Sequence, residues 1–147
     1  MKFHLIVDRE KPEEVVATVH APNSLTEKIE ALVREYSGQD AVAAYNDDEL
    51  RMIPYASIDC FTVIDGKTWA IDSKARRYRI RQRLYELEEV VPSSFFHINK
   101  STLANESRIQ HFTSTYSGGV NAIFKSGYED YVSRRSFAVI KRRFQVK

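Results

Sequence analysis

An Asp65–Gly66 pair between two apolar segments constrains the fold of this 147-residue chain more than any other feature. The pair lies between DCFTVI (residues 59–64) and TWAIDS (residues 68–73). An Asp-Gly pair is a strong signal for a two-residue hairpin turn, in which glycine adopts a positive φ at no steric cost. Both flanking segments are short and rich in β-branched and aromatic residues, as strands are. The sequence therefore predicts an antiparallel hairpin here.

Similar short segments continue along the chain from about residue 41. We expect further strands at residues 41–45, 50–55, 76–80, 108–116, 120–126 and 129–133. An amphipathic pattern predicts a helix at residues 81–91 that Pro92 ends, with Leu84, Leu87 and Val91 facing inward. A last helix is expected at residues 134–146, with Ser133 or Ser136 as its cap. Together these elements predict a mainly β domain with a few α-helices over residues 41–147.

The first 40 residues have a different character. Alternating apolar residues predict strands at residues 3–7 and 15–20, and helical spacing predicts a helix that begins with a Ser24–Glu27 capping box. This segment carries no motif associated with catalysis or ligand binding. We therefore expect a small β-β-α accessory region over residues 1–40.

Charge is distributed unevenly along the chain. Residues 1–60 contain 6 basic and 12 acidic residues, a net charge of −6, whereas residues 61–147 contain 16 and 8, a net charge of +8. A basic segment of this kind favours nucleic-acid binding, although charged residues also simply solvate a surface.

Several function classes find no support in the sequence. Cys60 is the only cysteine, so an intramolecular disulfide is excluded, and no stretch approaches the roughly 20 apolar residues of a membrane span. The first residues do not resemble a signal peptide, and we expect a cytoplasmic protein. The four histidines show no metal-binding spacing, and there is no Gly-rich phosphate loop. We expect neither catalysis nor a cofactor nor a metal site.

Three polar loops follow apolar elements and are candidate binding sites. They contain Lys67 and Thr68, then Asn99, Lys100 and Ser101, and finally Arg134 and Arg135. Lysine and arginine bind phosphates or guanine edges, and asparagine and serine form hydrogen bonds with bases. The alternatives are, in turn, a plain hairpin turn, a polar loop that caps a short helix, and arginines held in salt bridges.

A fourth basic feature is the segment KARRYRIRQR, residues 74–83. On a strand, Arg77, Arg79 and Arg81 share one face, while Tyr78 and Ile80 share the other. Such a row suits DNA phosphates. It also suits an edge strand that charge protects against aggregation.

The order of these pieces resembles the LytTR family of bacterial DNA-binding domains. The resemblance is carried by RLYELEEVVPSSFFHINKSTLANESRI (residues 83–109), then a hairpin, then YVSRRSFAVIKRRF (residues 131–144). The residues that match the family pattern are Leu84, Leu87, Phe95, Phe96, Ser101, Leu103, Asn105, Ile109, Val132, Ser133 and Arg134.

The resemblance implies an elongated, mostly antiparallel β fold that inserts loops into successive major grooves of double-stranded DNA. Carried over position by position, it makes Lys67, Thr68, Asn99, Lys100, Ser101, Arg134 and Arg135 the DNA-binding residues. We expect Lys100 and Arg135 above all to contact bases, held in place by the packing of Phe95 and Phe96. The family often has histidine at the place of Asn99 and an acidic residue at that of Thr62, which affects the base preference.

No receiver domain is expected in the short acidic segment, so the chain is similar to stand-alone LytTR transcriptional regulators. The resemblance implies a homodimer on repeated promoter half-sites and a small membrane protein as a regulatory partner. The alternative is a protein-interaction module that sequesters a partner through the acidic first 40 residues.

Overall fold

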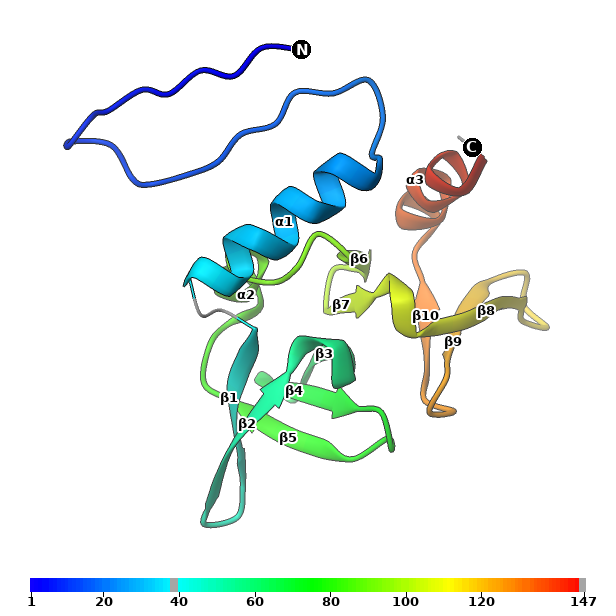
Figure 1. Cartoon of the computed structure of the whole chain (residues 1–147). Helices are drawn as coiled ribbons and strands as arrows, with labels where there is room; N and C mark the ends of the chain where they lie inside the picture. Colours follow the sequence, from blue (N-terminus) through cyan, green and yellow to red (C-terminus); the bar gives the residue numbers. More distant parts are fainter. Residues whose placement is uncertain (38–39, 146–147) are drawn as a thin grey trace. The chain divides into compact units, whose positions relative to one another are not determined.

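The structure, a computed structural model, describes residues 1–37 and 40–145 (Figure 1). The contacts between its residues divide the chain into two units, Met1–Gln39 and Asp40–Lys147. We call them the N-terminal unit and the main unit. No helix in the described part is both long enough and apolar enough to cross a membrane. That the two units are separate domains, with a boundary after residue 40, stays a prediction.

The N-terminal unit contains one helix, α1 (Ser24–Ser37), and no strand among its described residues (Figure 1). The single chain forms no strand at residues 3–7 or 15–20, so the prediction of strands there is wrong for the single chain. Two short strands are marginally stable in water unless further strands or a helix cover them. The apolar side chains of these segments are indeed exposed: Phe3, for example, retains 88% of its accessible surface.

The cap of α1 differs by one residue from the prediction. Oδ1 of Asn23 accepts hydrogen bonds from the backbone N–H groups of Leu25 (2.9 Å) and Thr26 (3.1 Å). Oγ1 of Thr26 in turn accepts one from the Asn23 N–H at 3.0 Å, so the bonds run both ways, as in a capping box. The expected Ser24–Glu27 box is displaced because asparagine is at least as good an N-cap as serine.

The described residues of the main unit form two antiparallel sheets and two α-helices (Figure 1). One sheet has the order β2-β1-β5-β4-β3-β7-β6, and the other has the order β10-β9-β8. The strands are β1 (Ala41–Asn46), β2 (Glu49–Pro54), β3 (Ile58–Ile64), β4 (Lys67–Asp72), β5 (Arg77–Ile80), β6 (Phe95–Asn99), β7 (Thr102–Asn105), β8 (Ile109–Ser114), β9 (Val120–Phe124) and β10 (Glu129–Val132). The helices are α2 (Leu84–Glu88) and α3 (Arg134–Gln145), and short 3-10 turns lie at Tyr55–Ser57 and Glu106–Arg108. The predicted mainly β, antiparallel fold is confirmed.

The Asp65–Gly66 hairpin forms as predicted between β3 and β4. Asp65 has a φ of 52° and Gly66 a φ of 74°, the pair of positive values that a type I′ turn requires. The α2 helix is shorter than expected, but Leu84 and Leu87 are buried on its inner face as predicted.

The polar loop expected after Phe96 is the turn of a second hairpin, formed by β6 and β7. This hairpin is difficult to predict from the sequence because the strand pairing shifts between His97 and Asn99. A bulge of this kind interrupts the strict alternation of buried and exposed residues. Ile98 and Asn99 are also both buried although they are neighbours, so the alternation typical of a strand is absent here.

Two apolar clusters cover the two faces of the central strands. Neighbouring residues of β3, Cys60 and Phe61, belong to different clusters, and so do Ala70 and Ile71 of β4. Successive side chains of a strand point to opposite faces of its sheet. One cluster continues into β1, β2 and α2, and the other continues into β9, β10 and α3. The central strands are therefore rigid supports for the turns at their ends.

Candidate nucleic-acid interface

The turns that follow β3 and β6 lie at the same end of the large sheet. Thr62 of β3 pairs with Thr102 of β7, and the Val63 N–H donates to the carbonyl oxygen of Ser101 at 2.9 Å. Lys67 is the first residue after the Asp65–Gly66 turn, so it lies close to the Lys100–Ser101 turn. We call this end of the sheet, where the two turns lie, the loop end.

The start of α3 is tied to the same loop end by hydrogen bonds. The Ser133 N–H donates to the carbonyl oxygen of Ile98 at 2.8 Å. The Asn99 side chain bridges two segments: its Nδ2 donates to the Tyr131 carbonyl oxygen at 2.8 Å, and its Oδ1 accepts from the Ser101 N–H at 2.8 Å. The three predicted loops are thus brought together, although they lie far apart in the sequence.

Arg134 and Arg135 are exposed in the first turn of α3, next to this junction. Ser133 caps the helix, as one of the two predicted caps, because its Oγ accepts a hydrogen bond from the Ser136 N–H at 3.1 Å. Cations at this position oppose the helix dipole. Within the described part of the chain neither arginine forms an ion pair, so both are available to an anionic partner.

The seven predicted site residues fall into two groups. Lys67, Lys100, Arg134 and Arg135 are exposed, and Ser101 is half-buried. Thr68 and Asn99 are buried, with 7% and 1% of their surface exposed. The Asn99 side chain satisfies its hydrogen bonds within the protein, so its geometry is that of a residue that holds the loop. Direct contact of these residues with DNA stays a prediction.

Buried and half-buried polar groups lie next to the loop end and connect the strands that carry it. The Thr102 hydroxyl donates to Oδ2 of Asp130 at 2.6 Å, and it accepts from the Thr62 hydroxyl at 2.8 Å. Burial, followed by the electrostatic influence of the Cys60 and Asp130 side chains, raises the pKa of the Tyr128 phenol to about 12. Burial likewise raises the pKa of the Cys60 thiol, which therefore stays protonated and is not suited to act as a nucleophile.

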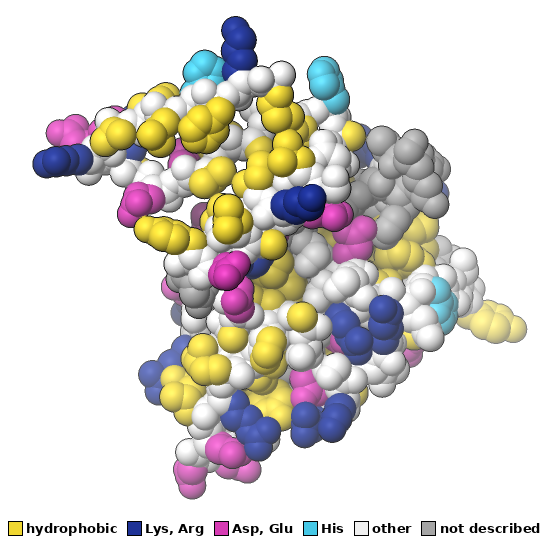
Figure 2. Space-filling view, viewed as in Figure 1, with side chains coloured by type: hydrophobic (Ala, Val, Ile, Leu, Met, Phe, Trp, Pro, Cys, Tyr) yellow, Lys and Arg dark blue, Asp and Glu magenta, His cyan; other side chains and the backbone are white. Residues whose placement is uncertain are grey.

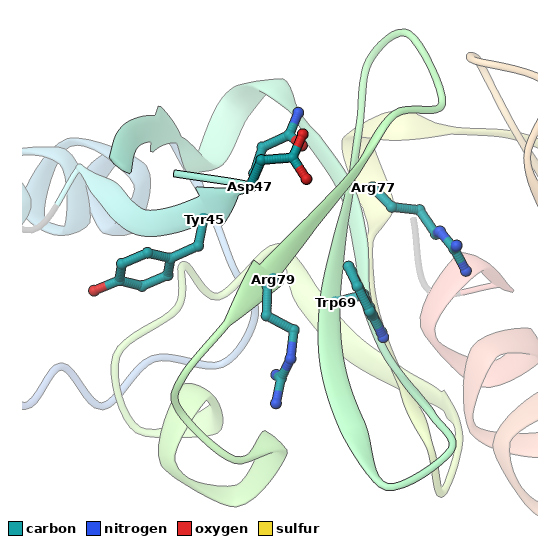
Figure 3. Close-up of a pocket in the computed structure, with 6 residues that line it drawn as sticks. Tyr45, Asp47, Trp69, Arg77 and Arg79 are labelled. Atoms are coloured by element: carbon teal, nitrogen blue, oxygen red, sulfur yellow. The ribbon is translucent and has the colours of Figure 1, made fainter. Parts of the chain in front are cut away.

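A basic and aromatic surface lies on one face of β1, β4 and β5 (Figure 3). The guanidinium carbon of Arg77 lies 5.0 Å from the centre of the Trp69 ring, and that of Arg79 lies 5.8 Å from it. The guanidinium carbon of Arg81 lies 4.5 Å from the centre of the Tyr45 ring. The shared face of the three arginines is as predicted, but their aromatic partners were not. The sequence contained a signal for these aromatic partners, since Tyr45 and Trp69 alternate with core residues along their strands and so point away from the core.

The alternative interpretation of this row as an edge strand is wrong. β5 lies between β1 and β4 in the sheet, and Arg79 faces Tyr45 on one side and Trp69 on the other. Arg79 also donates from Nη1 to the carbonyl oxygens of Thr68 (3.0 Å) and Ile80 (2.7 Å), which fixes its position. The row is therefore not explained by protection of an open edge.

Known proteins are similar to this chain in sequence and in fold. The family described as the LytTr DNA-binding domain matches residues 48–145. Two proteins of Staphylococcus aureus described as HTH-type transcriptional regulators, from strains MSSA476 and NCTC 8325, are each 28% identical over 148 residues, which cover 99% of this chain and 99% of theirs. In the described part of this chain, however, strands separate every pair of successive helices, so no helix-turn-helix is formed there.

A solved structure gives the same result for the fold. The LytTr DNA-binding domain of a methyl-accepting/DNA response regulator from Bacillus cereus matches with a TM-score of 0.65 and 17% sequence identity. The match covers 71% of this chain and 96% of that one. At this identity the likeness concerns the fold alone, whereas the family match spans most of the main unit. The chain belongs to the LytTR family of DNA-binding domains.

Proposed function

We propose that this chain is a transcriptional regulator that binds double-stranded DNA in a sequence-specific manner, with its loop end in the major groove. The observation that carries the proposal is the junction of three turns, which presents Lys67, Lys100, Arg134 and Arg135 together. All four side chains are exposed, and none forms an ion pair within the described residues. Family membership and the transcriptional regulators among the relatives support the same function.

The side chains of the loop end have different roles in this proposal. Lys100 and Arg135 read bases, since arginine and lysine pair with the O6 and N7 atoms of guanine. Lys67 and Arg134 bind phosphates or bases, and the Ser101 hydroxyl is available for a hydrogen bond. We assign Thr68 and Asn99 to positioning the loops instead of to direct contact, because both are buried.

The basic and aromatic surface adds attraction that does not depend on sequence. Arg77 and Arg79 lie on β5, and Arg81 directly follows its last residue, Ile80, which pairs with Thr68 near the loop end. Phosphate contacts position a protein on the duplex and make its affinity depend on salt. We therefore propose that this row follows the DNA backbone while the loop end reads bases.

The proposed regulator acts in the cytoplasm as a homodimer on repeated half-sites. A small membrane protein that controls it is a further proposed partner, which rests on the resemblance to stand-alone LytTR regulators. The competing function is a protein-interaction module that uses the N-terminal unit. That module would show no sequence-selective DNA binding, so one titration separates the two.

The test is a fluorescence-anisotropy titration of duplex DNA from the gene's own upstream region against a scrambled duplex. Arg135→Ala should cost about 1–3 kcal/mol in specific affinity and relax the preference at one base pair. Arg142→Ala is the matched control, because Arg142 is exposed on the same helix, about two turns further along. If Arg135→Ala binds both duplexes as the parent does, Arg135 reads no base.

A salt series separates base reading from phosphate contact at Lys100. Loss of a phosphate contact weakens binding to all sequences alike and reduces the salt slope by about 1. Loss of a base contact mainly affects the specific duplex. Lys125→Ala is the control, since Lys125 is exposed in the turn after β9, at the end of that sheet away from α3. Equal binding of both duplexes by the unmodified protein would contradict the proposed function as a whole.

A further inference from the structure

The N-terminal unit carries an unusual number of exposed apolar side chains. Figure 2 shows hydrophobic side chains in a row along this part of the chain. Apart from the first residue, Met1, the exposed large hydrophobic residues are Phe3, Leu5, Ile6, Val7, Val15, Val16, Leu25, Leu32, Val33 and Tyr36. We call them the N-terminal apolar surface. Single exposed apolar residues are ordinary, but a contiguous set of this size marks an interaction site.

Part of this surface has the pattern of a strand without a partner. Phe3, Leu5 and Val7 alternate along the chain and are 88%, 78% and 83% exposed. Within the described structure, residues 3–7 and 15–19 form no backbone–backbone hydrogen bond. An extended apolar segment with free N–H and C=O groups is a template for pairing with another strand.

The N-terminal unit is also too small to form a core of its own. It spans 39 residues, contains no cysteine, and its described residues hold no cluster able to bind a metal ion. Chains below about 40 residues usually need disulfides, metals or association with other chains to fold. With the first two absent from its described residues, the unit depends on packing against another surface.

A second copy of the chain supplies what one copy lacks. One copy offers two strand-like segments and α1, whereas two copies offer four such segments and two helices, enough for a stable sheet with a covered face. A sheet covered on one face leaves Ile6 and one of Val15 and Val16 on its open face, so about eight of the ten side chains, at roughly 100 Å² each, would bury about 800 Å² per partner, the size of a standard interface. Residues 1–39 contain 5 basic and 7 acidic residues, so two copies repel each other only weakly.

We propose that the N-terminal unit is the dimerisation element of this protein. Residues 3–7 and 15–19 pair with the same segments of a second copy, and the apolar face of α1 covers the sheet that results. The inference rests on the homodimer in the proposed function, and it assigns the interface to residues outside the part matched to the DNA-binding family, which begins at residue 48. Its test does not depend on DNA.

The test measures the mass of the full chain in solution by light scattering. The unmodified protein should have twice its chain mass of 17.0 kDa, and the double variant Leu5→Lys, Val7→Lys should have half the parent mass. The matched control is Leu50→Lys, Met52→Lys, which changes two exposed apolar residues at the same spacing on β2 of the main unit. This control should remain dimeric.

A folding check accompanies the mass measurement. Trp69 is the only tryptophan and lies in the main unit, so its fluorescence during thermal unfolding reports that unit. The N-terminal variant should keep the parent melting curve and its affinity for a single half-site, and lose the tighter binding to paired half-sites.

Each outcome bears on the proposal. A monomeric parent protein, or an N-terminal variant that remains dimeric, would overturn it, and so would dissociation of the control variant alone. If the masses change as expected but no duplex is bound selectively, the DNA-binding function fails while the dimerisation element stands.

Discussion

Replacement of Asn99 by alanine should lower the free energy of unfolding by about 2 kcal/mol, because it leaves two backbone groups without their partner. The groups are the Tyr131 carbonyl oxygen and the Ser101 N–H, each 2.8 Å from the Asn99 side chain. An unsatisfied buried polar group costs about 1–3 kcal/mol, and both groups give the lower part of that range, because Ser101 is half-buried and Tyr131 is 52% exposed, so water reaches them. Urea unfolding followed by Trp69 fluorescence measures the change.

The same substitution should weaken specific DNA binding about tenfold or more, since about 1.4 kcal/mol of lost positioning corresponds to a factor of ten. The Lys100 turn and the start of α3 would no longer be held in one geometry. Gln110→Ala is the matched control, because Gln110 carries an exposed side-chain amide on β8 and belongs neither to the loop end nor to the basic and aromatic surface. It should change neither stability nor affinity.

The combination of results decides the role of Asn99. If both stability and affinity fall, Asn99 positions the loop end, as its burial indicates. If affinity falls while stability is unchanged, Asn99 contacts DNA directly, and the prediction made from the sequence is right. If neither changes, the hydrogen bonds of Asn99 do not connect the three loops, and the reasoning fails.

Three further predictions concern other parts of the main unit. Arg108→Ala should destabilise the protein by about 3–5 kcal/mol in denaturant unfolding, because Asp59 is fully buried and pairs with Arg108 at 2.8 Å; the added change Asp59→Asn should restore part of the loss. Stability should fall as pH rises from 10 toward 12, because the pKa of Tyr128 is raised from its ordinary value of 10.0 to about 12 and the unfolded chain releases this proton first; in pH-dependent unfolding the fall should be smaller for Tyr128→Phe, where the raised pKa of the Cys60 thiol remains. Arg77→Ala should weaken binding to specific and scrambled duplexes alike and lower the salt slope by about 1 in anisotropy titrations, whereas unequal losses would contradict a phosphate contact.

Local signals in the sequence predicted much of the main unit correctly. The turn at Asp65 and Gly66 depends on two adjacent residues, and the division of Arg77 from Tyr78 depends only on the period of a strand. The inner face of α2 follows from helical spacing in the same way. Such features depend on neighbours within a few residues, so they can be read without the fold.

The errors arise where partners lie far away in the sequence or outside the chain. The β6–β7 hairpin was missed because a bulge at His97 breaks the alternation, and a bulge is defined by its partner strand. The predicted N-terminal strands do not form in the single chain, although apolar residues clearly alternate there, because a strand needs another strand to pair with. Periodicity describes which face a segment can bury, but it does not supply the surface that buries it.

The sequence by itself determined the family, the antiparallel β character, and the residue types at the three loops. Only the tertiary structure decided that these loops share one end of a sheet and that Asn99 is an internal bridge instead of a free amide. The bond from Asn99 to Tyr131 joins residues 32 positions apart, and that from Thr102 to Asp130 joins residues 28 apart. Contacts over such separations depend on the packing of whole strands, which no local preference of the chain contains.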